Sequence, residues 1–180
     1  MLLREAVEQA AGRADVRDAV RGIYARLQRE IDLRKPACSA SGRCCNFDRF
    51  GHRLYVTTIE LAAFAWQVRD REAEAASCAT VAASSVEWDG AGCRYQIDGL
   101  CSVHAIRPFG CRVFFCDPTS DEWQHAQYER FHAALKRLHD ELNVRYLYVE
   151  WRQALRELSL PLAVPRPARP NPLSLPQLPL

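Results

Sequence analysis

The sequence predicts a small, mostly α-helical domain with little β-structure, in which helices pack around a cysteine-rich loop region. Apolar residues recur at three- and four-residue steps in several segments, which is the period of an amphipathic helix. Seven of the eight cysteines fall in three short patches between those segments. The length of 180 residues suits one domain with a hydrophobic core of its own.

The first half of the chain contains two predicted helices. Residues 3–33 carry the helical period, which Gly12 and Gly22 weaken at two points. Leu54-Tyr55-Val56 favours a short extended piece. The following Thr57-Thr58-Ile59-Glu60 has the form of a capping box, and it predicts the start of a helix that continues through an apolar, Ala-rich stretch.

The second half is predicted to add two more helices. Residues 93–118 favour loop with brief turns, because four cysteines, two prolines and short apolar pieces alternate there. Asp121–Leu142 is a clear amphipathic helix, and residues 150–158 favour another. Residues 144–149 alternate weakly, so a strand and a further helical turn both remain open.

Composition divides the chain into three parts. Residues 1–36 form an N-terminal helical segment that Pro36 closes, and residues 37–159 carry all the cysteines. Residues 160–180 contain seven prolines, so we expect an extended or disordered tail, with a docking peptide as the alternative.

The cysteine patches indicate a shared metal site. The thiolate is a soft, anionic ligand, and zinc or iron binds several thiolates at once. Disulfides are the competing explanation. The N-terminus is charged throughout and lacks the apolar core of a secretory signal, so we expect a cytoplasmic protein, where metal binding is favoured over disulfides. The candidate ligands are Cys38, Cys44, Cys45, Cys93, Cys101, Cys111 and Cys116.

Charge and hydropathy exclude two classes of partner. The net charge is only +2 with both signs interspersed, whereas nucleic-acid binding needs a concentrated basic face. No run of 18 apolar residues exists, so no membrane span is predicted. The expected partners are a metal ion and, as an open question, a protein or peptide.

The identity of the metal is left open by the spacing. Seven thiols exceed one four-cysteine site, which allows two metals, a cluster plus a zinc, or spectator thiols. The chain lacks the paired C-x₂-C knuckles of structural zinc sites, and this slightly favours iron, as an iron–sulfur cluster or an irregular site, over zinc. Gly42 would let the first patch bend tightly. Cys78 stands apart and is predicted to be a buried, inert thiol.

Two stretches resemble the YkgJ-like cysteine-cluster family of zinc- or iron-chelating proteins, which is named for a CxxCxxCC motif. The first is Cys38-Ser39-Ala40-Ser41-Gly42-Arg43-Cys44-Cys45. The second, Gly99 to Phe114, is similar to the family pattern G-x-C-x-I-Y-x-x-R-P-x-x-C-R, with Val103-His104 where Ile-Tyr is usual. The resemblance covers roughly residues 37–117. Ser41 stands at the second cysteine of CxxCxxCC and is a poor ligand for a soft metal.

The resemblance implies metal binding more firmly than any reaction. By this resemblance, the candidate ligands are Cys38, Cys44, Cys45, Cys101 and Cys111, and Cys93 fits the cysteine that commonly precedes the second motif. Cys116 lies beyond the match and depends on spacing alone. The same domain is similar to part of flagellin lysine N-methylases, but no glycine-rich nucleotide loop supports a methyl-donor pocket here.

Other charged residues near the cysteines have ordinary interpretations. Arg107 and Arg112 flank Cys111, and we expect them to donate hydrogen bonds to loop carbonyls and compensate cluster charge rather than bind a substrate. His104 is expected to be solvated or bonded to backbone rather than a ligand. His125, His132 and His139 recur every seven residues, on the order of 10 Å apart along a helix, too far to share one ion. We place them at the edge of the apolar stripe.

Two classes of function follow. The first is a protein that binds iron or zinc to store, deliver or sense it, or to hold its fold. The second is a small iron-dependent metalloenzyme with an open coordination position, which would modify a peptide or thiol substrate. The binding protein is preferred, and whether the chain is an enzyme stays open.

Overall fold

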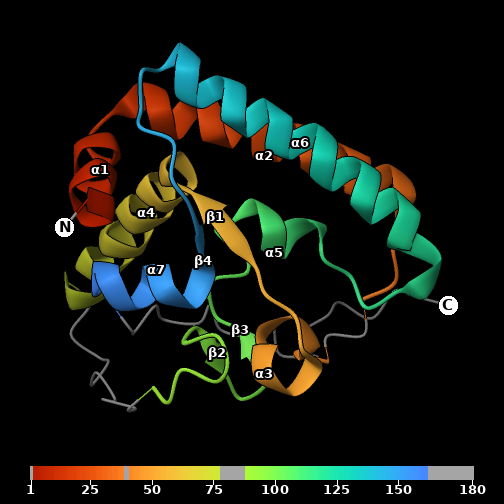
Figure 1. Cartoon of the computed structure of the whole chain (residues 1–180). Helices are drawn as coiled ribbons and strands as arrows, with labels where there is room; N and C mark the ends of the chain where they lie inside the picture. Colours follow the sequence, from red (N-terminus) through yellow and green to blue (C-terminus); the bar gives the residue numbers. More distant parts are fainter. Residues whose placement is uncertain (1, 39–40, 78–87, 162–180) are drawn as a thin grey trace, which may run out of the picture.

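The computed structural model describes residues 2–38, 41–77 and 88–161, and its elements are mostly helical (Figure 1). The fold class expected from the sequence is confirmed. The N-terminal helical stretch is divided in two, α1 (Leu2–Ala11) and α2 (Ala14–Arg34). The chain breaks the helix at Gly12, and Arg13 takes an extended backbone conformation before α2 begins. Gly22, in contrast, lies inside α2.

Helix α4 (Thr58–Ser77) begins where the capping box predicts. The Thr57 backbone N–H donates to Glu60 Oε2 at 2.9 Å, so the Glu60 side chain satisfies an amide that precedes the helix. Apolar residues lie on several faces of α4 and pack in two hydrophobic clusters. Leu61, Phe64 and Val68 pack in one, while Ile59, Ala62 and Ala63 pack in the other. A helix that is apolar on several sides is a buried one, so α4 is the centre of the fold.

Helix α6 (Asp121–Glu141) and α7 (Trp151–Leu158) confirm the two helices expected in the second half. In Figure 1, α6 runs alongside α2, and the two helices contact each other. One face of α7 is buried, formed by Trp151, Ala154, Leu155 and Leu158. His139, expected at the edge of the apolar stripe, is instead buried at 1% exposure, because its ring packs edge-on against Tyr146.

A two-stranded antiparallel sheet connects the halves of the chain. Strand β1 (Tyr55–Thr57) pairs with β4 (Tyr148–Glu150), with Val56 opposite Val149. The weakly alternating stretch before α7 therefore ends in a strand rather than a helical turn. The backbone N–H of Trp151 donates to the Leu54 carbonyl at 2.8 Å. This bond positions the first residue of α7 beside the cysteine region.

The cysteine region consists of short elements, as expected. These are the 3₁₀ helix η1 (Arg43–Cys45), α3 (Phe47–Phe50), strands β2 (Gln96–Ile97) and β3 (Leu100–Cys101), α5 (Phe109–Val113) and the 3₁₀ helix η2 (Pro118–Ser120). In Figure 1, α3, β2 and β3 lie below α7, and α5 lies beside β1. Cys78 and most of the Pro-rich tail lie outside the described residues. Within the described part of the chain, no helix is both long and apolar enough to cross a bilayer.

Candidate metal centre

Six cysteines from all three patches line one cavity of about 110 Å³. Cys44 and Cys45 come from η1, Cys101 from β3 and Cys111 from α5. The remaining two occupy loops before those elements. The six residues are Cys38, Cys44, Cys45, Cys93, Cys101 and Cys111. The fold therefore brings together sulfurs that the sequence separates widely.

Two hydrogen bonds to backbone carbonyls hold the first two patches against each other. The Cys93 N–H donates to the Cys45 carbonyl at 2.8 Å, and the Gln96 side-chain amide donates to the Gly42 carbonyl at 2.9 Å. Gly42 has a φ of 71°, and a Cβ at this position would collide with the Gly99 carbonyl oxygen. Glycine is therefore required here both by the backbone conformation and by the close approach of the two loops.

The hairpin of β2 and β3 positions Cys101. Ile97 pairs with Leu100 across a two-residue loop, and Asp98 and Gly99 both have positive φ, at 49° and 75°. This is the signature of a type I′ turn, for which Asp-Gly is a favoured sequence. The Asp98-Gly99 dipeptide is thus a signal for the hairpin that the sequence analysis did not use.

The thiol of Cys45 lies at the centre of the cluster. Hydrogen bonds with Cys101, Cys44 and Cys93 raise the pKa of Cys45 and lower the pKa of the other three. For Cys44 the bond from Cys45 is the main cause, and the charge of Arg107 adds to it, so its pKa falls to about 6. Because one S–H can donate to only one acceptor at a time, these four sulfurs share protons within a single hydrogen-bonded group.

Cys111 behaves differently from the other thiols. Burial, together with the negative charge of neighbouring thiolates, raises its pKa well above the usual value. Arg107, which lines the same cavity, opposes this effect. A bound cation would favour the thiolate of Cys111 far more than one guanidinium does.

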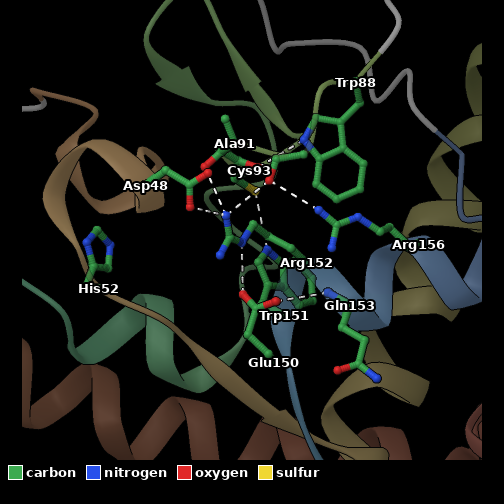
Figure 2. Close-up of polar contacts among 12 residues, drawn as sticks. Asp48, His52, Trp88, Ala91, Cys93, Glu150, Trp151, Arg152, Gln153 and Arg156 are labelled. Carbon is green, nitrogen blue, oxygen red and sulfur yellow. Dashed lines mark hydrogen bonds and ion pairs between the residues drawn. The ribbon is translucent and has the colours of Figure 1, made fainter.

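Trp151 is part of this site although no sequence motif indicated it. Its indole N–H donates to Cys93 Sγ at 3.3 Å, and the ring lines the cavity at 1% exposure (Figure 2). This hydrogen bond also lowers the pKa of Cys93, after the larger effect of Cys45. N–H groups that donate to ligand atoms tune metal sites, so Trp151 would be an outer-sphere donor if Cys93 bound a metal.

Arg152 fastens the loop that leads to Cys93. Figure 2 shows its guanidinium between Asp48 of α3, Glu150 of β4 and the loop carbonyls. It contacts Asp48 Oδ1 at 2.6 Å, Glu150 Oε1 at 3.1 Å and the Ala91 carbonyl at 3.2 Å. Its side chain is only 11% exposed and that of Glu150 only 14%, whereas Asp48 is 60% exposed, so the bond to Glu150 is better shielded from water than the bond to Asp48. Arg152 thereby joins three segments that position cysteines.

Arg112 donates to two loop carbonyls, as expected, at 2.8 Å to Arg107 and 2.7 Å to Ala105. Arg107 contributes its positive charge to the cluster, as expected, and its buried Nε has no hydrogen-bond partner among the described residues. His104 is exposed at the rim of the cavity, where partial desolvation of its ring and the charges of Arg107 and Arg112 lower its pKa.

Cys116 does not line the cavity and is exposed. It still belongs to the same region, because the Ala37 N–H donates to Asp117 at 3.2 Å and so brings the segments of Cys38 and Cys116 together. Ser41 is exposed and also absent from the cavity lining. None of His125, His132 and His139 lines it either.

The seven cysteines among the described residues are all free thiols. Over the same residues, no three histidine, cysteine, aspartate or glutamate side chains are arranged to hold a metal ion as they stand. The thiols are hydrogen-bonded to one another, an arrangement in which sulfurs share protons. Metal ligation replaces those protons, so the two arrangements differ in side-chain geometry.

Comparisons of the chain with protein-family models, curated proteins and solved structures find no significant match.

Proposed function

We propose that this protein binds iron, as an ion or an iron–sulfur cluster, or zinc through its clustered cysteines. The observation that carries the proposal is the cavity lined by six of the seven expected ligands. Chance would not bring sulfurs from three short elements and two loops into one space, and an apolar wall with few polar groups other than sulfur suits a soft metal.

The donor set fits such a metal. Cys44, Cys93 and Cys101 have lowered pKa values, and thiolates are the form that binds metal. With Cys45 at their centre they make four sulfurs, the number that a tetrahedral zinc or iron site requires. Cys111 and Cys38 line the same cavity and are the candidates for a larger site.

The surroundings of the sulfurs support the same proposal. Trp151 donates to one sulfur and Arg107 supplies positive charge, so both would offset the negative charge of a thiolate-bound centre. A metal held there would supply a cation that fixes the loops in place. The chain's own residues already align those loops through Gly42, Gln96 and Arg152.

Two further features extend the proposal to family and compartment. The two motifs around the cavity cysteines are those that resemble the YkgJ-like family, and we include the chain in that family as part of the proposal. Free thiols of low pKa are oxidised easily, so the proposal places the protein in the reducing cytoplasm.

The proposal is tested by metal content. Full-length protein purified without oxygen should contain stoichiometric iron or zinc by elemental analysis. Brown protein with acid-labile sulfide identifies a cluster, iron without sulfide identifies an iron ion, and colourless protein with zinc identifies a zinc site. Metal-free protein that also fails to take up Fe²⁺ or Zn²⁺ would refute the proposal.

Matched cysteine variants locate the site. Cys101→Ser removes a sulfur that lines the cavity, whereas Cys116→Ser makes the same chemical change outside the lining. We expect metal affinity to fall at least tenfold in the first variant and to stay near wild type in the second. Circular dichroism checks that both variants are folded. Loss of metal in Cys116→Ser with retention in Cys101→Ser would place the site elsewhere.

One observation favours the iron-dependent enzyme as a second candidate. The cavity is also lined by Arg107, whose buried Nε has no hydrogen-bond partner among the described residues. A free guanidinium N–H beside the sulfurs is suited to bind the anionic group of a substrate. If so, Arg107→Gln should retain metal and lose turnover of a thiol or peptide substrate.

A further inference from the structure

A second cavity, separate from the cysteine cavity, lies between α2 and α4. Its volume is about 280 Å³, and its wall includes Arg17, Arg21 and Tyr24 of α2, Trp66 of α4 and Arg112 of α5. It is larger than the cysteine cavity and close to the lower end of the range for small-molecule sites, about 300–1,000 Å³. No residue lines both cavities.

The charged side chains that line this cleft are all positive. Three arginines line it and no aspartate or glutamate does. The whole chain has a net charge of only +2, so this concentration is not a consequence of composition. Arg21 pairs with Asp18 at 2.9 Å, but both side chains are more than 60% exposed, so the pair is weak and easily exchanged.

Two of the three guanidinium groups are held in place. Arg17 donates to the Ala11 carbonyl at 2.8 Å and lies over the Trp66 ring, 4.5 Å from its centroid. Arg112 is fixed by its two carbonyl bonds and lies 4.4 Å from the centroid of the Tyr24 ring. Each of these arginines has further N–H groups besides those that donate to the loop carbonyls, because a guanidinium has five. The cleft therefore presents oriented donors at little entropic cost.

We propose that this cleft binds a small phosphate monoester with a planar aromatic part. A phosphate monoester carries about −1.5 to −2 charge at pH 7, which matches three arginines better than a single carboxylate does. Guanidinium groups bind phosphate oxygens in pairs and also stack on flat rings. Trp66, at 36% exposure, and the small side chain of Ala63 provide an apolar wall for the ring.

The proposal is tested by calorimetric titration of the full-length protein with phenyl phosphate, inorganic phosphate and phenol. We expect phenyl phosphate to bind more tightly than inorganic phosphate, and phenol not to bind. In NMR spectra, the indole N–H signal of Trp66 should shift with phenyl phosphate. Absence of heat and of that shift would overturn the proposal, and equal affinity for the two phosphates would overturn its aromatic part.

Arginine variants decide the location. Arg17→Gln and Arg21→Gln should each weaken phenyl phosphate binding about tenfold, the effect of losing a hydrogen bond to a charged group. Arg26→Gln is the matched control, because Arg26 lies on the same helix, is exposed and does not line the cleft. If Arg26→Gln weakens binding as much as the other two, the binding is a general charge effect and the proposal is wrong.

Discussion

The Glu60 carboxylate joins the central helix α4 to α5, the short helix that carries Cys111. Its Oε1 accepts a hydrogen bond from the Phe109 backbone N–H at 2.8 Å, and also one from the Tyr24 hydroxyl at 3.0 Å. Oε2 accepts from the backbone N–H and hydroxyl of Thr57, both at 2.9 Å. Burial raises the pKa of Glu60 although these bonds act against it. One carboxylate thus ties α2, α4 and the cysteine region together.

Glu60→Gln should therefore lower the free energy of unfolding by about 2 kcal/mol, because the new amide nitrogen cannot accept the hydrogen bonds of Oε2 and leaves a buried N–H unsatisfied. Urea denaturation measures the change. Glu129→Gln, an exposed position on α6, makes the same substitution without a buried network and should change stability by less than about 0.5 kcal/mol. Equal effects of the two substitutions would contradict the structural role of Glu60.

The contact between Gly42 and Gly99 should be intolerant of any side chain. Gly42→Ala places a methyl group against the Gly99 carbonyl in addition to requiring a positive φ. Gly51 has a similar φ of 66° but open space around it, so Gly51→Ala tests the backbone effect alone. We expect a loss of about 1 kcal/mol for Gly51→Ala and about 2 kcal/mol more for Gly42→Ala.

The same pair of glycine variants tests the metal centre. Gly42→Ala should also lower metal affinity, because the loop that carries Cys44 and Cys45 must move away from the hairpin that carries Cys101. Gly51→Ala should bind metal as wild type does. Competition with a chelator measures both affinities. Equal metal binding by the two variants would show that the contact between the loops does not shape the site.

His139 predicts a dependence of stability on acid pH. Its Nδ1 donates to the Val144 carbonyl at 3.0 Å, while its buried Nε2 has no partner among the described residues. Burial lowers the pKa of His139 below 6.5, so the unfolded chain binds a proton more readily than the folded one. The contribution of neutral His139 to the free energy of unfolding is therefore fully present above pH 6.5. It is lost as the pH falls below 6.5 and through the pKa that His139 has in the folded chain.

Replacing His139 with Leu should remove this component of the pH dependence. We expect the difference in unfolding free energy between wild type and His139→Leu to change between pH 7 and pH 5, with wild type losing more. His125→Leu is the control, because His125 is exposed on the same helix. A pH dependence that is unaltered in His139→Leu would show that His139 does not titrate on unfolding.

The sequence by itself determined where the longer helices lie and which segment of the chain forms the cysteine region. Local signals were sufficient for this: the capping box at Thr57–Glu60 set the start of α4, and the apolar period set α6 and α7. Such signals operate between residues three or four positions apart, so they are visible in the chain itself. The Asp98-Gly99 hairpin was equally local and was available to the same reasoning.

Only the tertiary structure decided which residues meet. Six cysteines line one cavity and Cys116 does not, and Trp151 and Arg152 join the site from a helix that carries no cysteine. The burial of His139 and the arginine cleft between α2 and α4 are decided in the same way. These contacts join segments far apart in sequence, and their energies arise from packing and burial, which no local pattern of residues encodes.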